Sequence, residues 1–185
     1  MSQLFYVVGA SGAGKDTLIN YARAKINGSE PVIFAHRYIT RPPFTGNENH
    51  ISLSVEEFQS RIAADLFALY WESHGNFYGI CREIDNWMEK GFNVVVNGSR
   101  QYLPVAQQIY PGIKVVLITA SPGTIYQRLF SRGREDANEI EKRIARTAEI
   151  GTEPDNCIGI LNDGSIEDAG DKLVNIISVK QKLYI

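Results

Sequence analysis

The stretch Gly9–Thr17, GASGAGKDT, decides the fold class of this 185-residue chain. It follows the pattern G-x-x-x-x-G-K-[ST] of a phosphate-binding loop, with Gly9, Gly14 and Lys15 in place. The apolar run 4–8 precedes it and a helix-forming segment follows it, as the motif requires. Glycines let backbone amides wrap phosphate groups, and the lysine adds a mobile positive charge. We therefore predict that this loop binds the phosphates of a nucleotide.

The residue after Lys15 departs from the pattern. A hydroxyl is expected there for a magnesium ion, whereas this chain has Asp16, and Thr17 comes one position late. Two interpretations stay open for Asp16. It is either a first-turn acid that suits the helix dipole, worth about 0.3–1 kcal/mol, or a carboxylate that takes part in the magnesium site. Asp16 and Thr17 are the candidate metal ligands, directly or through water.

Composition indicates a cytoplasmic enzyme or binding protein. Apolar residues make up 44% of the chain and charged residues 22%, which favours a packed core over disorder. The net charge of −2 gives no bulk support for binding nucleic acid or a membrane surface. The only two cysteines, Cys81 and Cys157, suit a reducing compartment. The chain has no signal-peptide core and no apolar run that approaches the roughly 20 residues of a membrane span.

Short β-favouring runs alternate with helical segments along most of the chain. We expect strands at 4–8, 32–40, 92–96, 113–119 and 157–161, with helices starting near Lys15, Ser54, Glu83, Ser121 and Ser165. Nearly continuous apolar strands between helices predict an α/β fold with a parallel five-stranded sheet covered on both faces.

Residues 37–82 interrupt this alternation. They read as an insertion of short strands and one helix, which we place over the carboxyl ends of the strands, where open α/β sheets bind ligands. Five of the eleven arginines lie between Arg128 and Arg146, so the basic residues are unevenly spread along the chain. The prediction is a single domain, 1–185, with a core made of 1–36, 83–127 and 150–185.

Several segments resemble the guanylate kinases in order and spacing. They are YITRPP at 38–43, GNEN at 46–49, GNFYG at 75–79, RLFSRGRE at 128–135 and ILNDGSIEDA at 160–169. The resemblance implies a phosphate-loop kinase fold and covers nearly the whole chain. It also implies that Tyr78 binds the acceptor phosphate and that residues 128–149 form a mobile lid whose arginines close over phosphates. The segment with Asn162 and Asp163 would line the adenine of ATP.

The departures from that family concern the base of the acceptor. A second arginine is replaced by Phe44, the glutamate that reads guanine falls at Leu69, and the serine that assists it falls at Ile80. Neither Leu69 nor Ile80 can hydrogen-bond guanine, and a site that lacks such bonds loses its selectivity for the base. We therefore expect a phosphorylated acceptor other than GMP.

The strings AHRYITR, ENHISLS, VVVNGSR and SRGRE are similar to the ribose 1,5-bisphosphate phosphokinase family of bacterial phosphonate metabolism. This family is related to the guanylate kinases and also carries G-K-D in its loop. The resemblance implies that ATP phosphorylates the 1-phosphate of ribose 1,5-bisphosphate to give 5-phosphoribosyl 1-diphosphate. Guanylate or other nucleoside monophosphate kinase activity, and a non-catalytic binding module, are the alternatives. A homodimer is left open.

Transfer to a phosphate needs charge neutralisation more than a strong base, because the second pKa of the acceptor is about 6. The candidate catalytic residues are Lys15, Arg41, Arg128, Arg132 and Arg134. The candidate ATP-binding residues are Gly9, Ala10, Ser11, Gly12, Ala13, Gly14, Lys15, Asp16, Thr17, Asn162 and Asp163. The candidate acceptor-binding residues are Arg37, Arg41, His50, Tyr78, Asn97 and Arg100. Mg²⁺ is the expected cofactor and ATP the co-substrate.

Asn97 bears on the unusual Asp16. Guanylate kinases carry an aspartate near the metal, after the strand that corresponds to 92–96, and here that place is Asn97. The chain thus gains a carboxylate at position 16 and lacks one at 97. We hypothesise that the acid has moved across the metal site while the total charge is kept.

Overall fold

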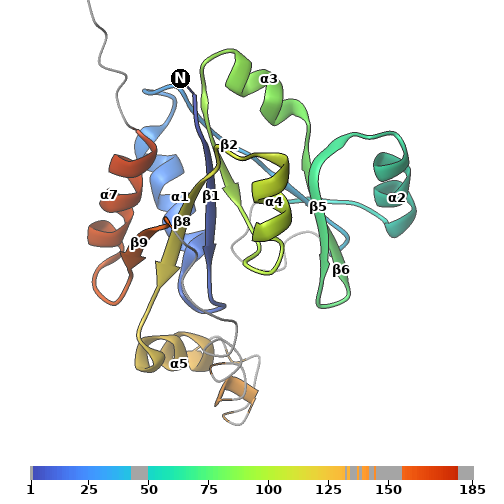
Figure 1. The fold of residues 1–185 in the computed structure, drawn as a ribbon. Helices are drawn as coiled ribbons and strands as arrows, with labels where there is room; N and C mark the ends of the chain where they lie inside the picture. Colours follow the sequence, from blue (N-terminus) through green and yellow to red (C-terminus); the bar gives the residue numbers. More distant parts are fainter. Residues whose placement is uncertain are drawn as a thin grey trace, which may run out of the picture.

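A computed structural model describes residues 2–42, 50–131, 133, 137, 139–141, 144 and 156–178. Its centre is a five-stranded parallel sheet with the strand order β2-β7-β1-β8-β9 (Figure 1). The strands are β1 Leu4–Gly9, β2 Val32–Phe34, β7 Asn93–Asn97, β8 Lys114–Thr119 and β9 Ile158–Leu161. The α/β class and the five parallel strands predicted from the sequence are confirmed.

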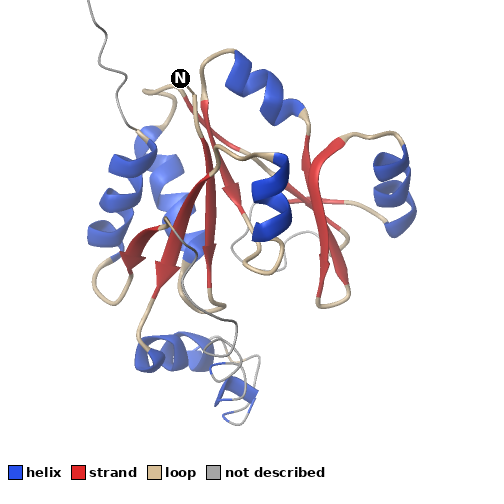
Figure 2. Cartoon of the chain, in the orientation of Figure 1, coloured by secondary structure: helices blue, strands red, loops and turns tan. Residues whose placement is uncertain are grey.

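Alternating side chains of the strands build a separate core on each face of this sheet. Phe5 and Val7 of β1 pack with α1 (Lys15–Ile26), α7 (Ile166–Ile177) and the apolar side of α5 (Pro122–Ser131). Tyr6 and Val8 point the other way and pack in the cluster that includes residues of α3 (Glu83–Glu89) and α4 (Leu103–Ile109). Because helices cover both faces of the sheet (Figure 2), both sets of alternating side chains are apolar, and the strands read as continuous apolar runs.

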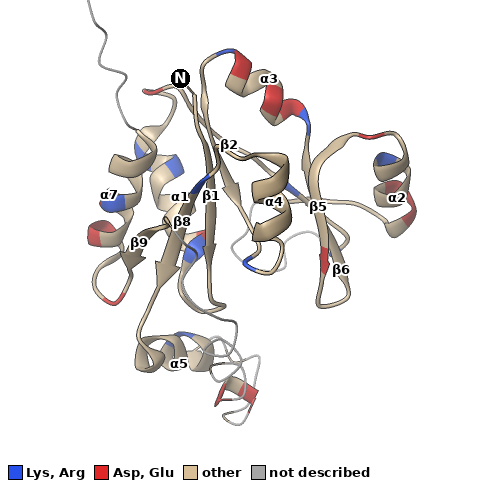
Figure 3. Ribbon diagram, viewed as in Figure 1, with Lys and Arg blue, Asp and Glu red and all other residues tan. Residues whose placement is uncertain are grey.

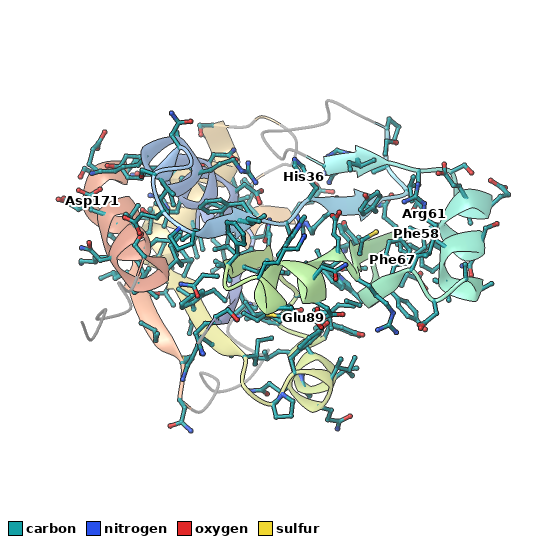
Figure 4. All side chains as sticks on the ribbon, turned by 90° about the horizontal axis from the view of Figure 1, so that it is seen from above. His36, Phe58, Arg61, Phe67, Glu89 and Asp171 are labelled. Carbon is teal, nitrogen blue, oxygen red and sulfur yellow. The ribbon has the colours of Figure 1, made fainter. Side chains whose placement is uncertain are left out.

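A second, four-stranded sheet is formed within residues 37–81, in the order β4-β3-β6-β5. Its strands are β3 Arg37–Ile39, β4 His50–Ser52, β5 Phe67–Ser73 and β6 Asn76–Cys81, and α2 Val55–Ala63 covers it. Phe58 of α2 stacks on Phe67 with ring centroids 4.6 Å apart. Figure 4 labels these two side chains near Arg61. The α2 helix begins as predicted, because Ser54 accepts a hydrogen bond from the Glu57 amide.

Three features differ from the expectations. The run 32–40 is two strands, since the chain leaves the parallel sheet after Phe34 and enters the second sheet at Arg37. The short elements β4 and α4 were not predicted. The second sheet lies beside the β2 edge, to the right in Figure 1, rather than over the strand ends, because β3 continues from that edge after only two residues.

Candidate active site

The phosphate-binding loop joins β1 to α1 at the carboxyl edge of the parallel sheet. Gly14, immediately before the helix, has φ 94°, in the left-handed region that favours glycine. A Cβ atom at Gly14 would come 2.4 Å from Asn162 Nδ2, and one at Gly9 would come 2.3 Å from the Ile118 carbonyl oxygen. These two glycines are therefore required by close approach of neighbouring elements as well as by the loop's own curvature.

Lys15 lies folded against the loop that precedes it. Its Nζ donates to the carbonyl oxygen of Gly9 at 2.9 Å and to that of Ala10 at 3.4 Å. The ammonium group thus sits at the mouth of the loop, beside the first turn of α1, where the amide groups and the helix dipole favour an anion. This arrangement fits the β- and γ-phosphates of a nucleotide.

The carbonyl oxygen of Ala13 in the loop accepts hydrogen bonds from two side chains of other elements. Asn162 Nδ2 donates to it at 2.8 Å, and an Arg128 guanidinium nitrogen donates to it at 3.3 Å. Arg128 also donates to the Asn162 carbonyl oxygen at 2.8 Å. Arg128 and Asn162 therefore hold the loop against α5 and the end of β9, so both of these predicted site residues lie at the loop. Their direct contact with a phosphate or adenine stays a prediction.

Asp163, the next predicted ATP-binding residue, connects two elements. Its Oδ1 accepts a hydrogen bond from the Ser121 amide at 2.7 Å, immediately before α5 begins. That hydrogen bond holds the pKa of the exposed carboxyl group below its usual range, and the positive charge of Arg128 acts in the same direction. Asp163 thus fixes the start of the helix that leads into the predicted lid.

Asp16 and Asn97 are in direct contact. Asn97 Nδ2 donates to Asp16 Oδ1 at 2.5 Å, which joins the start of α1 to the end of β7. The Asn97 side chain is buried, and its Oδ1 has no hydrogen-bond partner among the described residues. The pair thus presents carboxylate and amide oxygens, the ligand type that Mg²⁺ prefers.

The described residues contain no cluster of three or more His, Cys, Asp or Glu side chains fit to hold a metal. Magnesium in kinases commonly uses one or two protein carboxylates and takes its remaining ligands from phosphates and water. Asp16, with the Asn97 amide oxygen beside it, therefore fits this mode of binding, and a closed protein cage is not needed.

Most of the predicted acceptor-binding side chains come together on the second sheet. Arg37 pairs with His50 in the β3–β4 register, and Tyr78 pairs with Ile39 across β3 and β6. The guanidinium carbon of Arg37 lies 5.2 Å from the centre of the Tyr78 ring, close enough for a cation–π contact. Arg41 lies two residues beyond β3.

Arg100 approaches from the parallel sheet, three residues after β7 ends. Burial lowers the pKa of its half-buried guanidinium group. The segment is held by Tyr6, which sequence reasoning missed: the Ser99 amide donates to the Tyr6 hydroxyl at 3.0 Å. A tyrosine inside an otherwise apolar buried strand was the available signal, because a buried hydroxyl requires a partner. Burial raises the pKa of that hydroxyl above its usual value.

Comparison with known proteins identifies the family to which this chain belongs. Residues 1–180 match the guanylate kinase family. The chain is 48% identical to ribose 1,5-bisphosphate phosphokinase PhnN of Thiobacillus denitrificans, over 95% of this chain and 93% of the relative. It is 50% identical to the PhnN of Desulfomicrobium baculatum, over 96% and 95%. The chain belongs to the PhnN family of guanylate-kinase-like enzymes.

Solved structures agree on the fold. A guanylate kinase from Anaplasma phagocytophilum superposes with a TM-score of 0.69 at 18% identity, covering 97% of this chain and 87% of that one. An unliganded sugar kinase from Janibacter sp. superposes with a TM-score of 0.51 at 16% identity, covering 95% and 94%. The phosphate-loop kinase fold inferred from the sequence is thereby confirmed.

Two positions separate this PhnN family member from guanine-reading relatives. Leu69 on β5 and Ile80 on β6 are direct cross-strand partners, and both side chains are fully buried. They fall where the resemblance to guanylate kinases puts the groups that read guanine. Neither offers a hydrogen bond, so this part of the molecule is an apolar core.

Some predicted residues cannot be placed. Arg132 and Arg134 of the predicted lid lie outside the described residues, as does Phe44.

Within the described part of the chain, no helix is both long and apolar enough to cross a membrane. Figure 3 shows basic and acidic residues spread over most of the helices, with an acidic group on α3.

Proposed function

We propose that this chain transfers the γ-phosphoryl group of ATP to the 1-phosphate of ribose 1,5-bisphosphate. The products are 5-phosphoribosyl 1-diphosphate and ADP, and the step belongs to phosphonate catabolism. Relatives named ribose 1,5-bisphosphate phosphokinase are 43–50% identical to it over at least 92% of its length. The observation that carries the choice of acceptor is the buried pair Leu69–Ile80, which leaves guanine unread.

The reaction needs an ionised acceptor and an in-line approach. An oxygen of the 1-phosphate forms a bond to the γ-phosphorus, while the bond from that phosphorus to the bridging oxygen breaks and its electron pair leaves with ADP. Because the second pKa of a phosphate monoester is about 6, the acceptor is already mostly ionised at neutral pH. The protein therefore contributes positioning and charge neutralisation rather than a strong base.

The donor side is built from the loop and its supports. The amides of Gly9–Thr17 enclose the phosphates. Lys15 at the mouth of the loop stabilises the negative charge that develops on the bridging oxygen. Arg128 keeps the loop in register through Ala13. Arg41, Arg132 and Arg134 complete the neutralisation when the lid closes, and Asn162 and Asp163 border the adenine.

Magnesium would be held by Asp16, with Thr17 and the free Asn97 oxygen nearby, directly or through water. When bound, it would screen the negative charge of the donor phosphates. The hydrogen bond from Asn97 orients the Asp16 carboxylate, so the acid at position 16 takes the place of one at 97.

The acceptor side must hold two phosphates on one sugar. Arg37, Arg41, His50 and Tyr78 come from the second sheet, while Asn97 and Arg100 come from the end of β7. Guanidinium groups bind phosphate through paired hydrogen bonds, which suits a small ligand charged at both ends. We assign a cytoplasmic location, supported by the reduced thiols of Cys81 and Cys157. A homodimer stays a prediction.

The test compares acceptors directly. Purified enzyme with ATP and Mg²⁺ should give a kcat/KM for ribose 1,5-bisphosphate that exceeds that for GMP by about 10⁴-fold. This is the scale on which a ligand is rejected when buried polar groups, here those of guanine, find no hydrogen-bond partner. Equal or better use of GMP would make the chain a nucleoside monophosphate kinase. ATP binding without turnover of either acceptor would make it a binding module.

A further inference from the structure

Four side chains form one continuous stack between the two sheets. The Arg37 guanidinium lies 5.2 Å from the Tyr78 ring centre. Tyr78 stacks on Trp71 with centroids 5.6 Å apart and planes 3° from parallel. Trp71 in turn stacks on Tyr102 with centroids 5.4 Å apart at 28°. The stack therefore runs from β3 through β6 and β5 to the segment before α4.

Trp71 lies on the same face of the β5–β6 hairpin as the two apolar positions described above. Leu69 and Trp71 are two residues apart on β5, and they pair with Ile80 and Tyr78 on β6. Trp71 is only 7% exposed, and Leu69 and Ile80 are fully buried. The region where guanylate kinases read the base is thus filled by this chain's own side chains.

The indole of Trp71 has the shape of a purine. Both are planar fused rings of five and six members, and Trp71 lies between two tyrosine rings, an arrangement in which a base would stack. We propose that Trp71 determines acceptor specificity by occupying, with its own indole, the slot that a purine base would need. The proposal rests on the proposed function, because it explains how that acceptor site excludes nucleotides.

The indole of Trp71 excludes a base sterically, whereas Leu69 and Ile80 only withhold hydrogen bonds from it. An apolar pocket that merely lacks hydrogen bonds loses selectivity, but it still admits a flat ring that stacks well. A pocket already filled by a side chain rejects every purine through steric exclusion, which is a repulsive device for specificity. Tyr102 supports the indole from the parallel-sheet side, because its ring stacks on the face of Trp71 opposite Tyr78.

The experiment measures GMP as an inhibitor rather than as a substrate. In Trp71→Ala, the inhibition constant of GMP against ribose 1,5-bisphosphate should fall by about tenfold or more, the value of one base–aromatic stack. CMP, with a smaller ring, should gain less. The matched control is Trp87→Ala, because Trp87 packs against the same hydrophobic cluster but lies outside the stack. It should leave both inhibition constants as in the wild type.

A second variant, Trp71→Leu, keeps an apolar side chain for folding while removing the fused ring, and it should show the same preference for purines. Folded Trp71→Ala and Trp71→Leu proteins that exclude GMP as strongly as the wild type would overturn the proposal. So would an equal gain in Trp87→Ala. Calorimetry measures the binding of GMP directly, even if the wild-type enzyme forms no 5-phosphoribosyl 1-diphosphate. A failure of the proposed function is therefore distinguishable from a failure of the proposal for Trp71.

Discussion

Lys15 is placed by its loop as much as by its helix. Its ammonium group donates hydrogen bonds to the carbonyl oxygens of Gly9 and Ala10, so it is held at the loop that we propose binds the donor phosphates. Lys15→Ala should lower kcat by about 10²–10³-fold, because a preorganised charge at the transferred group is lost. Steady-state ADP release checks this. The control is Lys25→Ala on the same helix, which removes only exposed contacts with Asp171 and Tyr21 and should keep wild-type turnover.

The Asp16–Asn97 contact makes the exchange of acid and amide testable by reciprocal substitution. Asp16→Asn should raise the Mg²⁺ concentration needed for half-maximal activity by about tenfold, since one carboxylate ligand is lost. The double variant Asp16→Asn with Asn97→Asp returns a carboxylate to the other side of the same hydrogen bond. It should recover most of the Mg²⁺ dependence in a magnesium titration. A double variant no better than Asp16→Asn would contradict the exchange, and unchanged behaviour of Asp16→Asn would leave Asp16 as a helix-dipole acid.

At the scale of elements, the end of β9 supports the phosphate-binding loop. Asn162→Ala removes the buried donor to the Ala13 carbonyl, which should cost about 1–3 kcal/mol of unfolding free energy. It should also raise the KM for ATP, because the loop amides lose their alignment. Chemical denaturation and ATP titration measure the two effects.

Ser165→Ala is the matched control for Asn162→Ala. Ser165 caps α7 by accepting from the Asp168 amide, in the same segment but away from the loop. Its loss should cost about 1 kcal/mol and leave the KM for ATP unchanged. Equal ATP affinity in both variants would show that Asn162 serves stability alone.

Asp163 gives the start of α5 a pH dependence. Its folded-state pKa is lowered, first by the hydrogen bond from the Ser121 amide, so the carboxylate stabilises the fold above its unfolded-state pKa of about 3.9. That contribution is lost as the pH falls through the lower folded-state value. Urea midpoints measured from neutral to strongly acidic pH should show Asp163→Asn less stable than wild type near pH 7, with the difference shrinking in acid. A difference that stays constant with pH would exclude this role.

What the sequence could predict depended on how much of an element's signal is local. The five parallel strands and the caps at Ser54 and Ser165 were predicted because each pattern is contained in one segment. The three-residue edge strand β4 is too short for an alternation. The break after Phe34 was missed because both halves of 32–40 favour strands, and only tertiary pairing sends them to different sheets.

The candidate site also contains residues that a local motif predicts and residues that only the tertiary structure brings together. Loop glycines and Lys15 follow a fixed motif, so their roles could be read directly. The contact of Asp16 with Asn97 could be suspected from a missing acid, although the two residues lie 81 positions apart. Tyr6 and the stacked Trp71 carry no motif, so nothing local in the sequence marks their positions. Trp71 is buried, and its position between two tyrosine rings depends on two strands and a loop.

At the scale of the whole molecule, the residues of the proposed donor and acceptor sites are divided between two sheets. The parallel sheet supplies the loop, Asn97 and Arg100, and the second sheet supplies Arg37, His50 and Tyr78. The interior next to the acceptor side is filled by Leu69, Trp71 and Ile80. We therefore infer that the architecture combines a nucleotide-kinase donor site with an acceptor site that takes a sugar bisphosphate and excludes a base.

The most direct measurement is a competition in one reaction. Ribose 1,5-bisphosphate and GMP at equal concentration are incubated with the enzyme, Mg²⁺ and limiting ATP labelled at the γ-phosphate, and the products are separated and checked by phosphorus NMR. The account predicts that the label enters a diphosphate on the sugar's carbon 1, with the 5-phosphate unchanged, and that GDP stays at background. Label in GDP, or in the 5-phosphate position, would contradict it.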